Sequence, residues 1–144
     1  MIVRRGLIPG LTIAAVGMLG LGAVAMGAGA PPGGGRVREV RIVIHHSRFE
    51  LPSVDVAPGE SVRFVLENTD PIDHEFIVGD ARVQLAHERG TEAHHPPRPG
   101  EVTVPAGTTR ATTVTFPPST GTTLFGCHLP GHYAYGMVGT IEIG

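Results

Sequence analysis

The sequence of 144 residues contains no lysine and a single cysteine, Cys127. One cysteine cannot form a disulfide bond within the chain, so Cys127 is either free or bound to another group. The 11 basic residues are therefore all arginines, and they stand against 13 acidic residues for a formal net charge of −2. Such a mild and scattered charge argues against nucleic acid or an anionic membrane surface as the main partner.

Charge is also missing from most of the N-terminal segment, MIVRRGLIPGLTIAAVGMLGLGAVAMGAGA (residues 1–30). After Arg4 and Arg5 this segment contains only uncharged residues, and it ends in small ones. A positive start, an apolar run and small residues at the end are typical of a secretory signal peptide. The small residues allow cleavage after Ala25 or after Ala30.

The same apolar run is long enough to act as an uncleaved membrane anchor over residues 7–30, so both interpretations stay open. In either case we expect an exported protein whose functional domain is periplasmic or extracellular. Residues 31–36 begin with PPGGG and are typical of a flexible linker. Residues 37–144 are long enough for one domain with one core, and they contain no internal repeat.

From residue 37 onward, apolar residues recur at about every second position, and turn residues separate short runs of them. This pattern predicts about eight short strands and little helix. An all-β, antiparallel Greek-key sandwich is the expected fold. The predicted strands lie around residues 40–44 and in SVDV, SVRFVLEN, HEFIV, EVTV, RATTVTF, TTLFGC and MVGTIEI.

The segment DARVQLAHERG (residues 80–90) departs from the strand pattern. Asp80 is suited to capping the start of a helix, and Gly90 is suited to ending one. We therefore expect one short helix on a long loop that continues through TEAHHPPRPG.

Four groups with affinity for soft or borderline metals lie in the C-terminal segment FGCHLPGHYAYGM, namely Cys127, His128, His132 and Met137. Cys127, His132 and Met137 have the spacing C-x4-H-x4-M, and Met137 is the only methionine beyond residue 30. A further histidine, His74, stands at the start of a predicted strand. Because loops from distant strands meet at one end of a sandwich, His74 can join the other three.

Two imidazoles, one thiolate and a weak axial thioether are the ligand set of blue copper sites. Zinc usually takes four strong ligands, or three and a water molecule, and a thioether suits it poorly. The set tolerates both copper(I) and copper(II), so little rearrangement accompanies electron transfer. Four protein ligands also leave no open position for a substrate, and we therefore do not expect an enzyme.

Residues 37–144 resemble the cupredoxins, small type 1 copper proteins of the plastocyanin/azurin kind. The similarity rests on the C-x4-H-x4-M loop and on FELPSVDVAPGESVRFVLENTDPIDHEF, which leads into the upstream histidine. The resemblance implies one type 1 copper ion. It also implies that His74 and His132 bind through Nδ1, that Cys127 is the thiolate ligand and that Met137 is the axial ligand.

The chain departs from the family pattern at two positions. Many cupredoxins have an asparagine directly after the first ligand histidine, where it connects the two ligand loops, and this chain has Glu75. The loop CHLPGHYAYGM also matches multicopper oxidases, but those enzymes have a histidine just before the cysteine, and this chain has Gly126. Without that histidine and without any H-x-H motif, a trinuclear oxygen-reducing cluster is not expected.

Other histidines have alternative interpretations. His87, His94 and His95 belong either to a solvated polar loop or to an accessory copper or zinc site. His128 follows Cys127, so its side chain is expected to point the opposite way, either supporting the site from behind or facing solvent. His45 and His46 are expected on opposite faces of a strand and therefore not to bind a metal together.

Two phenylalanines and two tyrosines flank the candidate ligands. Phe76 and Phe125 are expected in the core beneath the site, where a dry environment tunes the reduction potential. Tyr133 and Tyr135 lie in the ligand loop, where packing is a more common role than redox chemistry.

The leading hypothesis is an exported electron carrier that passes single electrons through the exposed edge of His132. A small apolar patch around His132 would receive redox partner proteins in short-lived encounters. Its expected members are Pro71, Ile72, Leu129, Pro130 and Ala134. We expect a monomer, and a membrane contact only if the N-terminal segment is retained.

Two other functions stay open. A copper-binding protein for copper resistance or delivery is supported by the histidine-rich loop, although residues 31–144 lack methionine-rich tracts. A copper enzyme would need a second copper site between subunits.

Overall fold

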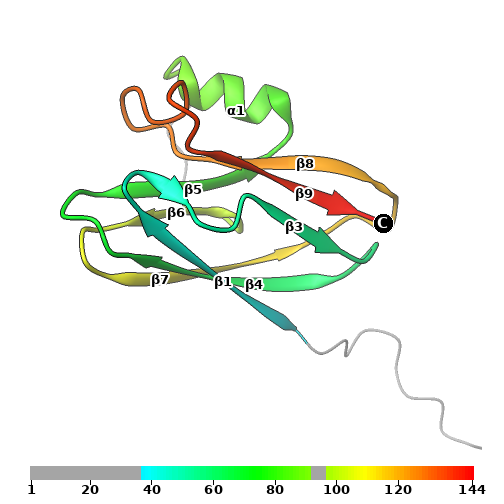
Figure 1. Cartoon of the computed structure of the whole chain (residues 1–144). Helices are drawn as coiled ribbons and strands as arrows, with labels where there is room; N and C mark the ends of the chain where they lie inside the picture. The colour runs from blue at the N-terminus through cyan, green and yellow to red at the C-terminus, as the bar shows by residue number, and fades with distance from the viewer. Residues whose placement is uncertain (1–36, 92–96) are drawn as a thin grey trace, which may run out of the picture. The chain divides into compact units, whose positions relative to one another are not determined.

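The computed structural model describes residues 37–91 and 97–144 (Figure 1). The predicted signal peptide or anchor, the linker 31–36, and the possible ligands His94 and His95 lie outside the described residues. Within the described ranges, no helix combines the length and the apolar character needed to cross a membrane.

Nine strands in the described residues form two sheets, and one helix accompanies them (Figure 1). Sheet A has the strand order β2 (Arg48–Phe49), β1 (Arg38–His45), β4 (Ser61–Asn68) and β7 (Thr109–Thr115). Sheet B has the order β3 (Ser53–Val56), β9 (Val138–Ile143), β8 (Gly121–Gly126), β5 (His74–Gly79) and β6 (Glu101–Val104). The all-β sandwich fold expected from the strand pattern is confirmed.

Aromatic rings from both sheets meet in the core. Phe64 of β4 lies with its ring centroid 5.2 Å from that of Phe76 of β5. Phe76 is in turn 5.2 Å from Phe125 of β8, and all three side chains are fully buried. Alternate residues of a strand face the same side, so the apolar period of two in the sequence places these residues between the sheets.

The pairing of the strands differs from the expected all-antiparallel arrangement. Strand β1 pairs in parallel with β4, and β3 pairs in parallel with β9. The prediction of an antiparallel sandwich is therefore wrong for these two pairs. Both pairs join strands that the chain does not connect by a tight hairpin, and such long-range pairing is not visible in the periodicity.

The ninth strand, β2, was not expected from the sequence. It pairs with β1 through a two-residue turn at His46 and Ser47, where both residues have φ of +52°. Turns of this kind usually contain glycine or asparagine, because other residues rarely adopt a positive φ. The sequence HHSR carries neither residue, so it gave no signal for a hairpin.

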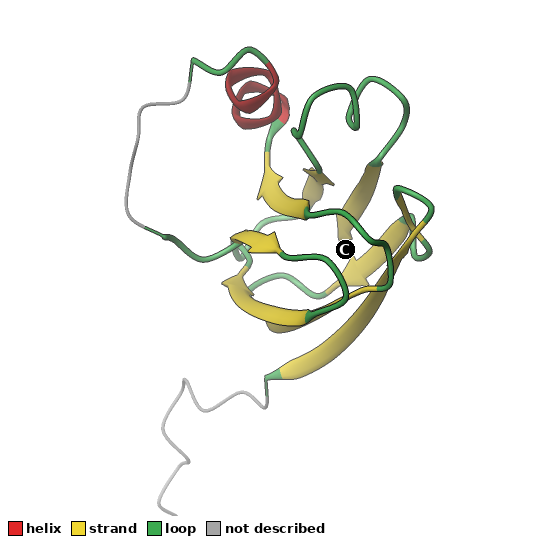
Figure 2. Ribbon diagram, turned by 90° about the vertical axis from the view of Figure 1, so that its left-hand side faces the viewer, coloured by secondary structure: helices red, strands yellow, loops and turns green. Residues whose placement is uncertain are grey.

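Helix α1 (Ala81–Glu88) confirms the helix expected over residues 80–90. Asp80 caps its start, because the Asp80 carboxylate accepts hydrogen bonds from the N–H groups of Arg82 and Val83 at 2.9 and 3.0 Å. Gly90 follows its end with φ of +62°, a conformation that glycine adopts without strain. Figure 2 shows the helix outside the two layers of strands, and it packs against β5 and β8 of sheet B.

Gln84 connects helix α1 to sheet B. Its side chain is almost fully buried, and its Nε2 donates hydrogen bonds to the carbonyls of Ile77 and Gly79 at 3.0 and 3.3 Å. A buried amide without such partners destabilises a fold, so these bonds favour one position of the helix on the sheet.

Candidate metal centre

The first predicted ligand, His74, is the first residue of β5 and its side chain is fully buried. Its ring is held on one side, because Nε2 lies 3.0 Å from Oδ2 of Asp70 in the loop between β4 and β5. Burial lowers the pKa of the His74 imidazole, and this effect outweighs the nearby Asp70 carboxylate. A neutral imidazole is the form that binds a metal.

Asp70 was missed in the sequence-based prediction. Only 6% of it is exposed, and it accepts hydrogen bonds from the backbone N–H groups of His46 and Ser47, each at 2.7 Å. Burial alone raises the pKa of this carboxyl, but the N–H groups of Ser47 and His46 and the His74 ring outweigh it and leave the pKa below its ordinary value. The available signal was a carboxylate four residues before a ligand histidine.

The second predicted ligand, Cys127, directly follows β8 and is fully buried. Its Sγ accepts a hydrogen bond from the N–H of Glu75 at 3.3 Å, so the two ligand segments are joined at this point. The main chain of Glu75 thus connects the two ligand segments in a chain without the asparagine of many cupredoxins. Burial raises the pKa of the Cys127 thiol, and a bound metal would have to displace its proton.

The third predicted ligand, His132, lies in the loop between β8 and β9 and is half-buried. Pro130 and Gly131 form a turn, in which the N–H of His132 donates to the carbonyl of Leu129 at 2.9 Å and Gly131 has φ of +84°. This turn brings the imidazole of His132 back toward Cys127.

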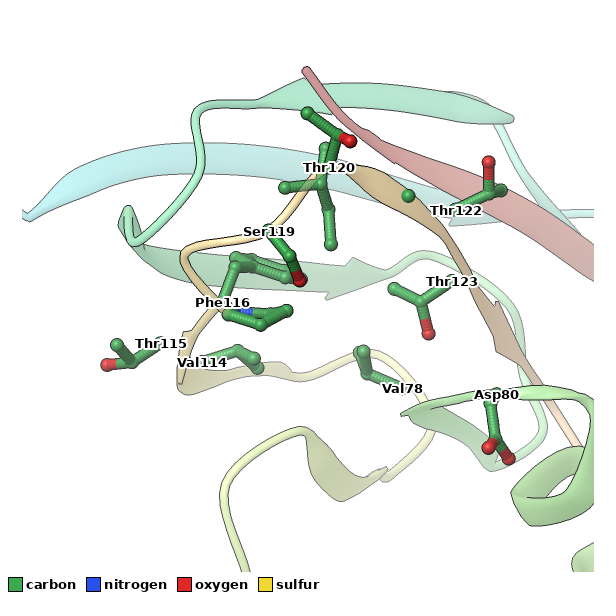
Figure 3. A pocket seen from close by; sticks show the side chains of 12 residues that line it. Val78, Asp80, Val114, Thr115, Phe116, Ser119, Thr120, Thr122 and Thr123 are labelled. Carbon is green, nitrogen blue, oxygen red and sulfur yellow. The ribbon is translucent and has the colours of Figure 1, made fainter.

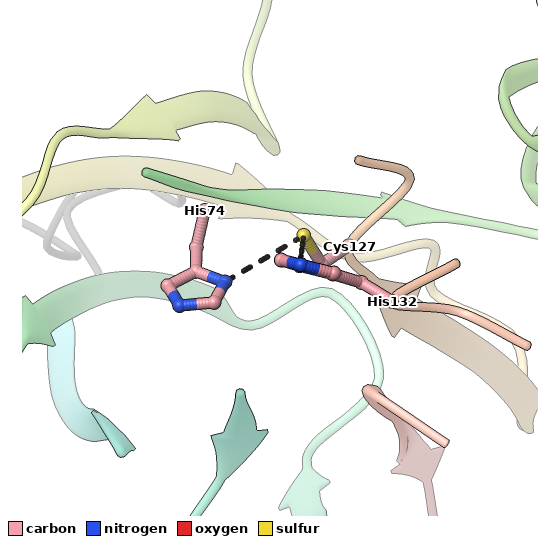
Figure 4. A group of neighbouring side chains, drawn as sticks. All are labelled: His74, Cys127 and His132. Atoms are coloured by element: carbon pink, nitrogen blue, oxygen red, sulfur yellow. Dashed lines mark hydrogen bonds between the residues drawn. The ribbon is translucent and has the colours of Figure 1, made fainter. Parts of the chain in front are cut away.

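The three predicted donors meet in one cluster (Figure 4). Sγ of Cys127 lies 3.9 Å from Nδ1 of His74 and 3.3 Å from Nδ1 of His132, and the donor atoms of the three residues lie within 4.8 Å of one another. An ion with bonds of about 2.0 to 2.3 Å to three such atoms in a plane separates them by about 3.5 to 3.8 Å. The donor set therefore fits a metal ion, and both imidazoles present the nitrogen that the cupredoxin resemblance implies.

The predicted axial ligand, Met137, is fully buried directly before β9. Its carbonyl accepts a hydrogen bond from the N–H of Cys127 at 3.1 Å, and its N–H donates to the carbonyl of His132 at 2.9 Å. The main chain of Met137 is thus tied to two of the three clustered donors. Coordination by its sulfur stays a prediction.

His128 points away from the cluster as expected, but it does not face solvent. Only 2% of its side chain is exposed. Its Nδ1 lies 3.0 Å from Oε2 of Glu88 and its Nε2 lies 2.8 Å from Oε1 of Gln84, both on helix α1. The ring also stacks on Tyr133, with centroids 4.6 Å apart. Helix α1 therefore covers the residue next to the cysteine, which the sequence alone could not show.

The possible accessory site stays untested. His87 stacks against His128 with centroids 5.6 Å apart, and its Nε2 lies 3.8 Å from Oε1 of Glu101. Its proposed partners His94 and His95 lie outside the described residues. Across residues 37–91 and 97–144, the only cluster of three or more histidine, cysteine or acidic side chains that could hold a metal is the one at Cys127.

His45 and His46 do not lie on opposite faces, so that prediction is wrong. Their ring centroids are 3.8 Å apart. The alternation of strand side chains ends at His45, because His46 belongs to the turn between β1 and β2. Nδ1 of His45 lies 2.9 Å from Oγ1 of Thr69.

A separate cavity of about 370 Å³ lies beside β7 and β8 (Figure 3). Valine, phenylalanine and threonine side chains dominate its lining, and Asp80 is the one ionisable residue among them. The Asp80 carboxylate already caps helix α1. The cavity contains none of the predicted metal ligands, and nothing in its lining indicates a reaction.

Comparisons with known proteins agree with the chemistry of the cluster. Residues 39–144 match the sequence profile of the copper-binding proteins of the plastocyanin/azurin family. The chain is 36% identical over 110 residues to the copper-resistant cuproprotein CopI of Rubrivivax gelatinosus, covering 74% of this chain and 66% of that protein. It is 34% identical over 134 residues to CopI of Vibrio cholerae, covering 89% of this chain and 76% of that protein.

The fold also has a counterpart among solved structures. Reduced auracyanin from Roseiflexus castenholzii superposes with a TM-score of 0.63 at 19% identity, covering 76% of this chain and 99% of that one. At this identity the likeness concerns the fold alone. The matched family, the names of the relatives and the cluster of two imidazoles and a thiol all support copper as the metal. The chain therefore belongs to the plastocyanin/azurin family of copper-binding proteins.

Proposed function

We propose that this protein is an exported copper protein, periplasmic or extracellular, that binds one copper ion and contributes to copper resistance. The observation that carries the proposal is the cluster of His74, Cys127 and His132. In this proposal Met137 is the axial ligand. The role in resistance is supported by the relatives, which are named copper-resistant cuproproteins. Export rests on the signal-like N-terminal segment.

The residues around the cluster limit what can reach the metal. His74, Cys127 and Met137 are fully buried, and only His132 is partly exposed. Water and small ligands are therefore excluded from most of the site. Because four protein side chains would fill the coordination positions of a type 1 site, we propose no catalytic turnover at this metal.

A second candidate function is the transfer of single electrons between partner proteins. Copper, when bound, supplies a one-electron couple between the +1 and +2 states. The arrangement of the donors favours this role, because hydrogen bonds from Glu75 and to Asp70 already hold Cys127 and His74 in place. The geometry of a site that is held in this way changes little between the two oxidation states of copper.

Partner proteins would dock on the apolar side chains near His132. Ile72 is 47% exposed, Pro130 and Ala134 are also exposed, and Leu129 is half-buried. A small apolar surface of this kind suits brief redox encounters. We propose that the protein works as a monomer, since one copper bound within one chain needs no second subunit.

The first experiment tests the metal centre. The copper-free protein is loaded with copper(II), and its visible spectrum, bound copper and sedimentation are measured. We expect an intense thiolate-to-copper band, one tightly bound copper per chain and a monomer. A colourless complex would remove the type 1 assignment. Two or more tightly bound copper ions would instead support an accessory site, which replacement of His87, His94 and His95 should then abolish.

The second experiment separates copper binding from electron transfer. A copper-sensitive host lacking its own protein is complemented with the wild type, with Ile72→Asp and with His132→Ala. Val37→Asp is the matched control, because Val37 is 48% exposed at the start of β1, away from the ligand loops. If binding alone confers resistance, Ile72→Asp grows like the wild type and only His132→Ala fails. If resistance requires electron transfer, Ile72→Asp fails as well although it retains copper.

A further inference from the structure

We propose that Asp70 is a positioning residue for the copper site. Asp70 holds the His74 ring so that Nδ1 faces the metal, and the turn between β1 and β2 holds Asp70. The part of this inference that concerns the bound metal rests on the proposed function. Neither the family match nor the relatives assign a role to this carboxylate.

The contact between Asp70 and His74 selects one form of the imidazole. Oδ2 of Asp70 lies 3.0 Å from Nε2 of His74, and both side chains are buried. An ionised carboxylate only accepts hydrogen bonds, so Nε2 must carry the ring proton. The lone pair is then on Nδ1, which is the nitrogen 3.9 Å from Sγ of Cys127. Histidine ligands are commonly oriented in this way by a carboxylate at their second nitrogen.

Asp70 is itself held from the far side. Oδ1 accepts the N–H of His46 and Oδ2 accepts the N–H of Ser47, each at 2.7 Å. The N–H of Asp70 donates to Oδ1 of Asn68 at 3.0 Å. With both carboxylate oxygens engaged, rotation of the side chain would break at least one hydrogen bond in a buried place, which is unfavourable.

The turn that holds Asp70 is unusual in its backbone. His46 and Ser47 both have φ of +52°, which is costly for residues with a side chain. The two hydrogen bonds to Asp70 compensate for this strain, because they satisfy N–H groups that point into the protein. The turn and the carboxylate therefore stabilise each other, and both lie behind the ligand His74.

This arrangement has a consequence for the metal. A carboxylate bonded to the far side of an imidazole makes the ring a stronger donor, which favours copper(II) over copper(I). Asp70 should therefore lower the reduction potential of the centre. A residue that served only the stability of the fold would leave the potential of the folded protein unchanged.

The test on the loaded protein uses Asp70→Asn, which removes the charge at nearly constant size. We expect copper(II) binding to weaken about tenfold relative to copper(I), and a one-electron couple reports that change as a rise of about 59 mV. Asp55→Asn is the matched control, because Asp55 is an exposed carboxylate on β3 and its loss should leave the potential unchanged. An unchanged potential in Asp70→Asn, with the visible band retained, would overturn the proposal.

A second measurement does not depend on copper. In the metal-free wild type, nitrogen NMR of the His74 ring should show the proton on Nε2 alone, and Asp70→Ala should give a mixture of the two forms. If either variant does not fold, the measurement is made with Ser47→Gly added, since glycine adopts a positive φ without strain. A wild-type ring protonated on Nδ1 would refute the positioning role. A correct ring form in a protein without a visible copper band would refute only the proposed function.

Discussion

The two sheets of this sandwich contribute to the metal centre in different ways. All four predicted ligands lie on strands of sheet B or in the loop between two of them, because His74 begins β5, and Cys127, His132 and Met137 lie between β8 and β9. Sheet A provides none of them. Its outer face instead carries exposed ion pairs between β1 and β4, such as Arg41 with Glu67 and Arg63 with Glu39, each at 2.8 Å.

This difference separates the residues predicted to bind the metal from the residues that hold those ligands in place. The helix and the loop next to sheet B contain buried polar groups with hydrogen-bond partners that hold them in place, as Gln84 of helix α1 and His128 illustrate. Sheet A reaches the site through the turn at His46 and Ser47, which bonds to Asp70. It also does so through Asn68 of β4, which accepts the N–H of Asp70, and through Arg48 of β2, which donates to a carbonyl of the loop that holds His132. Changes in sheet B should therefore alter the metal centre, whereas changes in sheet A away from these contacts should alter stability alone.

The largest effect is expected at the thiol of sheet B. Cys127→Ser should abolish the visible copper band completely, because no other thiolate is present to bind the ion. The measurement is the absorption spectrum of the copper(II)-loaded variant. Thiol titration of the metal-free wild type should find one reactive group after unfolding, and the variant should show none. A band that survives in the variant would mean that the cysteine is not a ligand.

A core change in sheet A should have a large effect on stability alone. Leu66 on β4 is fully buried, and Leu66→Ala should lower the free energy of unfolding by about 3 kcal/mol through lost burial and a cavity. Urea denaturation measures the loss. Below the transition, the copper spectrum and the copper content should equal those of the wild type. Leu51→Ala, at a site that is 38% exposed, is the control and should cost far less. A changed copper spectrum in Leu66→Ala would show that the core of sheet A also affects the metal centre.

A change on the buried face of helix α1 should affect both stability and the copper spectrum. Gln84→Ala removes the partner of the Ile77 carbonyl and of the His128 ring, so we expect a loss of about 2 kcal/mol in unfolding free energy. Because His128 is next to Cys127, the copper band should also shift. Leu85→Ala on the same helix is 47% exposed and should change neither quantity. An unaltered band in Gln84→Ala would show that the helix supports the fold without supporting the site.

The smallest effect is expected at the surface of sheet A, between Arg38 and Glu60. The hydrogen bond from Arg38 holds the pKa of the Glu60 carboxyl below its ordinary value of 4.5. A lowered pKa in the folded state stabilises the protein above that ordinary value, and the contribution is lost as the pH falls through the folded-state pKa. Glu60→Gln should therefore cost about 0.5 kcal/mol at neutral pH and progressively less in acid, as urea denaturation at several pH values would show. Glu50→Gln, an exposed residue on the same sandwich, should show no such trend.

Much of the fold could be predicted because each strand carries its own signal. The strands at SVDV, SVRFVLEN and EVTV have the bounds expected from their period of two, and Asp80 and Gly90 mark the two ends of the helical segment. The approach of Cys127 and His132 was also predictable, since they lie in one short loop whose turn is set by Pro130 and Gly131. These features depend on neighbours in the chain.

Other features depended on which distant strands pair. The parallel pairing of β1 with β4, the approach of His46 and Ser47 to Asp70, and the burial of His128 under helix α1 all join residues more than 20 positions apart. Local periodicity places a side chain on one face of a strand but does not say what that face meets. The predicted ligands could therefore be chosen from the sequence, because ligand chemistry depends on residue types and short spacings. Their support was decided only when packing brought separate segments together, because hydrogen bonds require contact in space.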